Sequence, residues 1–141
     1  MPKITIDLPR LTVFVIDDQD YVRSIIVQLL RRLGVGKVHE CDGGPSALET
    51  MRDIKPDLIF CDIRMKPMDG LQFLREVRNG KSVADAAVPV IFLTSASDRN
   101  TVEEAIKEDV SGYMVKPVSA NDLKDKIISV MTKRLAKGAA W

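Results

Sequence analysis

Short apolar segments alternate with longer amphipathic segments along most of this chain. The apolar segments are rich in β-branched and aromatic residues and cover residues 11–16, 37–40, 58–62, 88–93 and 112–116. Each is followed by a segment whose apolar residues recur at helical spacing. Five such β-then-α units in strict alternation predict an α/β fold with a parallel, doubly wound sheet and right-handed crossovers.

Glycine, proline and capping residues mark the ends of the expected helices. The first helix begins at Asp20 and ends before Gly34, and the third runs from Gly70 to Asn79-Gly80. Ser97 or Asp98 is expected to cap the fourth, and Ser119 or Asn121 the fifth. The helices are expected to point apolar residues inward, including Ala47, Leu48, Met51, Ile54, Val102, Ala105, Ile106, Leu123, Ile127, Ile128, Met131 and Leu135.

The segment from Leu58 to Gly70 organises the rest of the prediction. Its first residues form a short apolar run bounded by Pro56 and Pro67, typical of a strand covered on both faces. Asp62 falls at the carboxyl end of this strand. In open α/β sheets the ligand crevice lies outside the carboxyl ends of the strands, so this acid is placed for chemistry.

Further polar residues follow the other strands: Asp17 and Asp18 after the first, Thr94 after the fourth and Lys116 in the fifth. In a parallel sheet they converge with Asp62 on one crevice. Crowded carboxylates repel one another by about 4 kcal/mol per close pair at an effective dielectric of 20, so a hard cation such as Mg²⁺ is expected between them. A hydroxyl and an ammonium beside them suit an incoming phosphoryl group, which predicts that Asp62 is the acceptor.

Together these residues resemble the receiver domain of two-component response regulators, in particular single-domain chemotaxis regulators. The resemblance rests on Asp17-Asp18, the segment from Asp62 to Asp69-Gly70, Thr94 and residues 113–117, and it extends from Leu11 to Leu135. It implies a flavodoxin-like sheet with strand order 2-1-3-4-5 and five helices. It also implies that Asp62 takes a phosphoryl group from a histidine kinase or a histidine phosphotransfer protein.

The family resemblance also implies a role for each residue around the acceptor. Asp18 and Asp62 would hold Mg²⁺ directly, Asp17 largely through water, and Arg64 through its backbone carbonyl. Thr94, Lys116 and the backbone amides of Arg64 and Ser95 would bind the phosphoryl group. The domain would catalyse its own phosphorylation and dephosphorylation without being an enzyme in the usual sense.

A conformational switch is a further implication. Phosphorylation adds roughly −1.5 to −2 charges, Thr94 would move toward them, and Tyr113 would rotate into the vacated space. The face formed by the fourth helix, fifth strand and fifth helix would then change its protein partners, with homodimer formation as one outcome. The free energy that couples two such sites is typically about 1 to 3 kcal/mol, so phosphorylation is expected to shift the conformational equilibrium only in part. Binding of a partner would complete the shift.

The sequence departs from the family pattern in the loop after Asp62 and at two variable positions. Pro67 stands one place later than in many receivers. Arg64 and Ala96, two residues after Asp62 and Thr94, carry neither an acid nor an amide to orient an attacking water. We therefore expect slow self-dephosphorylation, with the Arg64 side chain covering the phosphoryl group.

Length, charge and cysteine content narrow the function classes. The 141 residues suit one domain, divided into an extension (1–10), the receiver domain (11–135) and a tail (136–141). A formal charge of +1 disfavours direct nucleic-acid binding. The absence of a long apolar segment or signal peptide predicts a cytoplasmic protein without membrane insertion. Cys41 and Cys61 are expected to be free thiols.

Two alternatives belong to other function classes. Residues 18–22 fit the nucleophile motif of haloacid-dehalogenase-type phosphatases, with Asp18 as nucleophile. That reading leaves Asp62 without a role and places Asp122 and Asp125 within a helix rather than at a strand end. A flavin-binding module is weaker, because no hydroxyl- and glycine-rich loop follows the first strand.

Overall fold

The computed structural model describes residues 4–95 and 98–138 and contains one five-stranded sheet. The strands are β1 (Thr12–Ile16), β2 (Lys37–Cys41), β3 (Leu58–Asp62), β4 (Val90–Thr94) and β5 (Gly112–Val115). Their order is β2-β1-β3-β4-β5, and every neighbouring pair is parallel. This confirms the doubly wound, flavodoxin-like topology expected from the sequence.

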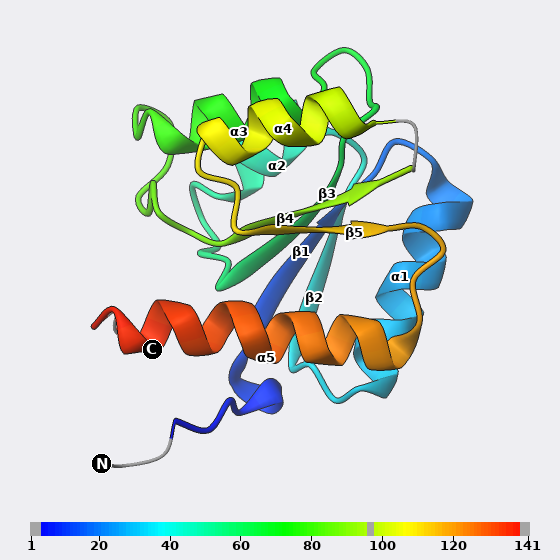
Figure 1. Cartoon of the computed structure of the whole chain (residues 1–141), viewed down its shortest axis with the longest axis vertical. Helices are drawn as coiled ribbons and strands as arrows, with labels where there is room; N and C mark the ends of the chain where they lie inside the picture. The colour runs from blue at the N-terminus through cyan, green and yellow to red at the C-terminus, as the bar shows by residue number, and fades with distance from the viewer. Residues whose placement is uncertain (1–3, 96–97, 139–141) are drawn as a thin grey trace.

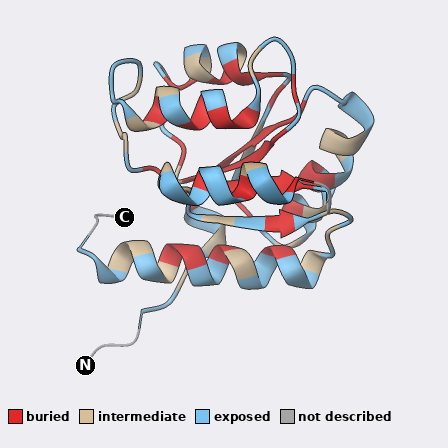
Figure 2. Ribbon diagram, turned by 45° about the horizontal axis from the view of Figure 1, so that its top comes forward, coloured by how far each residue is buried: buried red, intermediate tan, exposed pale blue. Residues whose placement is uncertain are grey.

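Helices cover both faces of the sheet and enclose a separate apolar core on each (Figure 1). They are α1 (Asp20–Arg32), α2 (Gly44–Thr50), α3 (Gly70–Arg78), α4 (Arg99–Lys107) and α5 (Ala120–Ala136). One core lies under α2, α3 and α4, and the other under α1 and α5. The helical residues that reach these cores are buried, while the outer faces of the helices are exposed (Figure 2).

Burial along the strands explains the hydrophobic pattern of the sequence. Every residue of β3 and β4 is buried, because both strands have a neighbour on each side and a helical layer on each face. The edge strands β2 and β5 are only partly buried. The continuous apolar run ending at Asp62 is therefore a consequence of its central position.

Side chains cap the starts of two helices, and of these two caps only Ser119 was expected from the sequence. Asp69 and Gln72 form a capping box on α3, in which the Asp69 carboxylate accepts a hydrogen bond from the Gln72 amide at 2.8 Å. At α5 the Ser119 hydroxyl accepts a hydrogen bond from the Asp122 amide at 3.1 Å.

Some sequence predictions of boundaries and burial are wrong. Asp98 occupies the N-cap position of α4, but its side chain makes no capping hydrogen bond; Ser97, the alternative cap, lies outside the described residues. The second helix ends at Thr50, before Met51 and Ile54, which were expected on it. Ile106 and Ile128 were expected to face inward but are 60% and 38% exposed. Spacing alone misplaces them because α4 and α5 each contact the sheet through a narrow stripe.

The segment before β1 packs on the domain. Leu8–Arg10 form a short 3₁₀ helix, and Ile6 and Leu8 pack against the core beneath α1 and α5. The Gly36 amide donates a hydrogen bond to the Leu8 carbonyl at 3.2 Å. A Cβ atom on Gly36 would lie 1.9 Å from the Pro9 carbonyl oxygen, so this close approach requires glycine.

The two cysteines are free, as expected, and both are buried, so their thiols should be unreactive in the folded protein. Burial raises the pKa of Cys41 from 9.0 to about 11 and that of Cys61 well above 9.0. The thiolate is the reactive form, so at pH 8.5 we expect both residues to resist alkylation in the native state. Mass spectrometry after iodoacetamide treatment should find two adducts in denatured protein. Rapid modification of native Cys41 at this pH would contradict the buried placement.

Candidate functional site

Three carboxylates meet at the carboxyl end of the sheet. Asp17 and Asp18 follow β1, and Asp62 is the last residue of β3, the neighbouring strand. Each offers an oxygen within 4.8 Å of the others. Asp17 and Asp62 are buried, whereas Asp18 is exposed and accepts a hydrogen bond from the Lys66 amide at 3.2 Å. The cluster has the spacing and oxygen chemistry of a hard-cation site.

One oxygen of Asp17 receives no hydrogen bond from the described residues, and its nearest ion-pair partner is the Lys116 ammonium at 3.8 Å. Its Oδ1 accepts a hydrogen bond from the Gln19 amide at 2.9 Å. Its Oδ2 is buried without a hydrogen-bond partner in the described part of the chain. The Arg23 side chain donates to the Asp17 carbonyl at 2.6 Å and fixes the backbone there. A buried carboxylate oxygen without a donor is costly, so Oδ2 is suited to a cation or an ordered water.

Asp62 and Lys116 form the central ion pair of the site. The Lys116 ammonium lies 3.1 Å from Asp62 Oδ1 and 3.8 Å from Asp17 Oδ2. Burial raises the pKa of the Asp62 carboxyl above its usual value, Lys116 opposes that rise, and Asp17 adds to it. Lys116 is thus the single described cation that contacts both buried carboxylates.

Gly70 allows α3 to start directly against the end of β3. Its amide donates a hydrogen bond to the Ile63 carbonyl at 2.7 Å. A Cβ atom on Gly70 would lie 2.6 Å from the Asp62 carbonyl oxygen and 2.9 Å from the Ile63 Cα. Both are backbone atoms, so a larger residue would displace the loop that follows Asp62. The loop itself contains a cis peptide bond between Lys66 and Pro67.

On the other side of Asp62, the end of β4 carries a second polar cluster around Asp98. Its Oδ1 accepts a hydrogen bond from the Arg64 Nε at 2.6 Å. Its Oδ2 lies 3.1 Å from the Thr94 hydroxyl, 3.2 Å from the Ser95 amide and 3.0 Å from the Ser95 hydroxyl. Burial would raise the pKa of Asp98, but these hydrogen bonds outweigh it and lower the pKa below its usual value.

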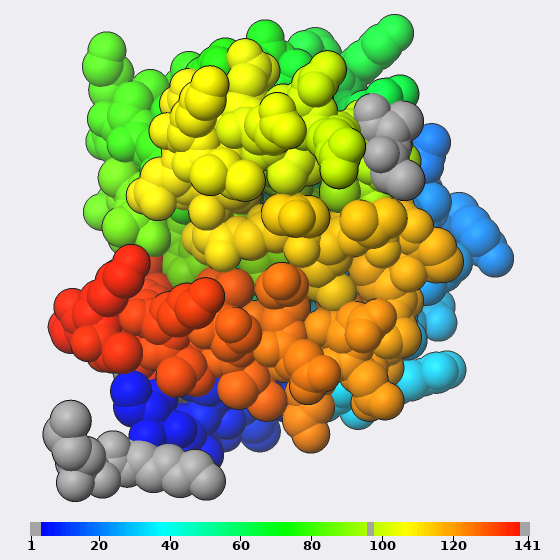
Figure 3. Space-filling model, viewed as in Figure 1, coloured from blue at the N-terminus to red at the C-terminus, as the bar shows by residue number. Residues whose placement is uncertain are grey.

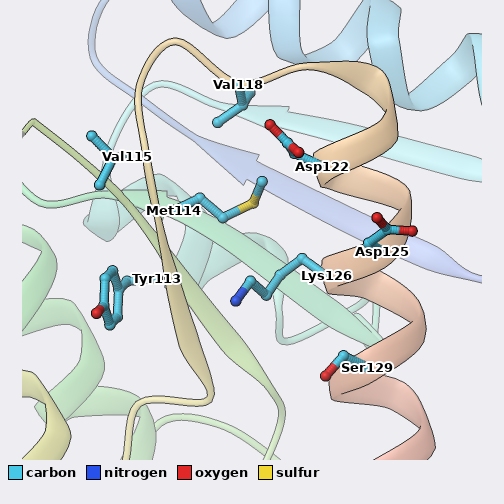
Figure 4. Close-up of a pocket in the computed structure, with 8 residues that line it drawn as sticks. All are labelled: Tyr113, Met114, Val115, Val118, Asp122, Asp125, Lys126 and Ser129. Carbon is cyan, nitrogen blue, oxygen red and sulfur yellow. The ribbon is translucent and has the colours of Figure 1, made fainter.

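Tyr113 lies apart from the acidic cluster, on β5. Its side chain is 45% exposed and, with Val115, lies on one side of the strand (Figure 4). Met114 and Lys126 lie on the other side, and all four residues line a groove of about 430 Å³ bordered by β5 and α5. In the space-filling view this groove belongs to a continuous face formed by α4, β5 and α5 (Figure 3).

The structure thus brings Asp17, Asp18, Asp62 and Lys116 into direct proximity, with Thr94, Ser95 and Arg64 joined beside them through Asp98. Ala96, the second variable position, lies outside the described residues.

Sequence reasoning missed two contributors to this arrangement. The helical pattern alone places Arg23 on an outer helix face and gives it no role at the site, although Asp20 three residues before it signals an ion pair, here 2.8 Å long. Asp98 was assigned to a helix cap. A cation at Arg64 implies a nearby acid, but no sequence spacing identifies Asp98, 34 residues away, as its partner.

Comparison with known proteins decides what kind of domain carries this site. A family model described as the response regulator receiver domain matches residues 13–128. The chain belongs to this family. The receiver domain is 34% identical over 121 residues to the chemotaxis protein CheY of Pseudomonas aeruginosa, covering 86% of this chain and 96% of that protein.

Solved receiver structures have the same fold. A response regulator receiver domain from Clostridium thermocellum superposes with a TM-score of 0.80 at 26% identity, covering 89% of this chain and 98% of that one. The receiver domain of a sensor histidine kinase from Pseudomonas aeruginosa, with a magnesium ion coordinated in its active-site cleft, gives 0.76 at 23% identity, covering 86% and 98%.

Receiver domains are signalling modules of two-component systems that interact with histidine kinases or phosphotransfer proteins, and this assignment gives no support to the haloacid-dehalogenase alternative. Across residues 4–95 and 98–138, every helix is too short or too polar to span a bilayer.

Proposed function

We propose that Asp62 of this receiver domain is the reversible phosphoacceptor for a phosphohistidine on a histidine kinase or histidine phosphotransfer protein. An Asp62 carboxylate oxygen attacks phosphorus and forms the acyl phosphate. The phosphorus–nitrogen bond breaks, and its electron pair remains on the imidazole nitrogen, which takes up a proton. The observation that carries this proposal is the buried Asp62 carboxylate, which is paired with Lys116 at 3.1 Å beside two further acids.

The residues of the acidic cluster fit a Mg²⁺ ion. The supporting observations are the three clustered carboxylates and Asp17 Oδ2, which is buried without a hydrogen-bond donor among the described residues. Asp18 and Asp62 would be direct ligands, and Asp17 would act largely through water. The backbone carbonyl of Arg64 would be the remaining protein ligand. When bound, the ion neutralises the carboxylates and the phosphoryl oxygens. The magnesium ion in the related sensor-kinase receiver supports this choice of metal.

The chain's own donors would then stabilise charge as phosphorus is transferred. Lys116 is already beside the acceptor and can move from Asp62 Oδ1 to a phosphoryl oxygen. The Thr94 hydroxyl and the backbone amides of Arg64 and Ser95 would bind the remaining oxygens. Preorganised donors of this kind supply most of the catalysis in phosphoryl transfer, because the protein has little covalent chemistry to perform.

Two exposed surfaces flank the site and suit protein partners. Tyr21 and Ile25, one turn apart on α1, are 79% and 43% exposed near the crevice, where a phosphodonor protein would contact them. On the α4–β5–α5 face, Tyr113 and Val115 are 45% and 50% exposed. Rotation of Tyr113 toward the space left by Thr94 would change this face for a downstream protein or a second copy of the chain.

Phosphorylation by a small phosphodonor tests the proposal without a cognate kinase. The purified chain is incubated with phosphoramidate and Mg²⁺, and intact-protein mass spectrometry measures phosphoryl incorporation. We expect one phosphoryl group on the wild type and none on Asp62→Asn. Chelation of Mg²⁺ by EDTA should leave little phosphoryl incorporation in the wild type. Asp53→Asn, an exposed acid beyond α2, is the matched control and should behave as the wild type. Equal incorporation in Asp62→Asn would exclude Asp62 as the acceptor.

A further inference from the structure

The carboxylate of Asp98 occupies an unusual position for a residue at the start of a helix. It is 5% exposed and turns back from α4 toward the end of β4 instead of capping the helix. There it is within hydrogen-bond distance of the Arg64 Nε, the Thr94 hydroxyl, and the amide and hydroxyl of Ser95. An ionised carboxylate has about four lone-pair sites, so this group of donors nearly saturates Asp98.

The partners of Asp98 overlap with the groups that a phosphoryl group on Asp62 requires. The Thr94 hydroxyl has one hydrogen, which it can donate to Asp98 at 3.1 Å or to the Ser95 carbonyl at 2.9 Å, but not to a third acceptor at the same time. The Ser95 amide also has one hydrogen, directed at Asp98 at 3.2 Å. A phosphoryl group can engage these two donors only after they leave Asp98.

We propose that Asp98 is a positioning residue that acts as an internal anion in the unphosphorylated domain. It holds the Thr94 hydroxyl, the Ser95 amide and the Arg64 side chain on itself and yields them to the phosphoryl group on Asp62. The proposal rests on the phosphoacceptor role of Asp62. It adds a competition between Asp98 and the phosphoryl group for the same donors, which sets the affinity of the site for the phosphoryl group.

The exchange also couples the site to α4. Asp98 immediately precedes Arg99, the first residue of that helix, and its own amide donates to the Ser95 carbonyl at 3.1 Å. When the donors leave, the Asp98 carboxylate is an anion that has lost its partners, and burying it becomes unfavourable. The start of α4 is then free to shift, which biases the α4–β5–α5 face that carries Tyr113.

Binding of a phosphoryl analogue tests the competition. Beryllofluoride with Mg²⁺ forms a non-covalent mimic of an acyl phosphate, and titration calorimetry or fluorescence gives its dissociation constant. Asp98→Asn removes the charge that retains the donors, so we expect beryllofluoride to bind about tenfold more tightly than to the wild type, within the usual range of such couplings. Asp53→Asn is the control. Equal or weaker binding to a folded Asp98→Asn would overturn the proposal.

A double-mutant cycle with Arg64 separates competition from a merely structural role. If Arg64 passes from Asp98 to the phosphoryl group, the gain from Asp98→Asn should shrink by at least threefold in an Arg64→Ala background. A role confined to folding would lower the melting temperature and leave the beryllofluoride affinity of the folded fraction unchanged. That outcome would also overturn the proposal.

A measurement on the wild type does not depend on the variants folding. Nitrogen-15 NMR can follow the Ser95 amide and the Arg64 Nε–H during a beryllofluoride titration. Both resonances should shift together with saturation, whereas unchanged resonances would show that Asp98 keeps its donors. Failure of the phosphoacceptor proposal has a different signature. In that case the wild type would bind no beryllofluoride, or Asp62→Asn would bind it equally well.

Discussion

Replacing Lys116 with methionine should slow phosphorylation of the domain by about 100- to 1,000-fold, the usual cost of removing one preorganised charge donor from a transition state. The ammonium lies 3.1 Å from Asp62 Oδ1 and 3.8 Å from Asp17 Oδ2, so it is beside the proposed acceptor. Methionine keeps much of the side-chain volume without the charge. The rate of phosphoryl incorporation from phosphoramidate, measured by intact mass against time, checks this expectation.

A second lysine provides a matched control for that variant. Lys126 is also partly buried, but it lies in the groove between β5 and α5 and not at the acidic cluster (Figure 4). Lys126→Met should therefore phosphorylate at the wild-type rate. If Lys116→Met retained more than a tenth of the wild-type rate, Lys116 would be a structural counter-ion and not a participant in the transfer.

Replacing Asp17 with asparagine should weaken Mg²⁺ binding by about 10- to 100-fold, as is typical when a group that orients a metal's ligands is lost. Asp17 Oδ2 accepts no hydrogen bond from the described residues and belongs to a cluster whose oxygens are within 4.8 Å of one another. Asparagine removes one of the negative charges of this cluster. Titration of the metal-free protein with Mg²⁺, monitored by NMR or fluorescence, measures the change.

The same substitution should not destabilise the metal-free protein. Without metal, Asp17 and Asp62 repel each other, and Asp17 contributes to the raised pKa of Asp62. Asp17→Asn relieves that repulsion, so the free energy of unfolding of the metal-free protein should stay constant or rise. Exposed Asp53→Asn should change neither quantity. Loss of stability together with unchanged Mg²⁺ affinity would mean that Asp17 serves packing and not the metal.

The sequence was informative wherever a residue's role depends on its place along a strand. The carboxyl ends of parallel strands lie at one edge of the sheet, so order alone placed Asp17, Asp62 and Lys116 together. The position of β3 between two neighbours explains the continuous burial of the run before Asp62. These features depend on topology, and the β-then-α alternation specifies topology.

Features that depend on how loops turn were beyond the sequence. An aspartate at this position is typical of a helix cap, and only the three-dimensional structure shows that its carboxylate accepts hydrogen bonds from Thr94, Ser95 and Arg64. The packing of Ile6 and Leu8 on the core was likewise invisible, because a short segment without periodicity carries no signal of its own. Such contacts join residues distant in sequence through irregular backbone.

Identifying the residue to which the phosphoryl group is covalently attached tests the central claim most directly. After phosphorylation with phosphoramidate and Mg²⁺, borohydride reduces an acyl phosphate to an alcohol and converts the modified aspartate to homoserine. Tandem mass spectrometry of the peptides then identifies the position. We predict homoserine at position 62 alone. Homoserine at position 18, which the phosphatase alternative requires, or at no position while the intact protein carries phosphorus, would contradict the assignment of Asp62 as the acceptor.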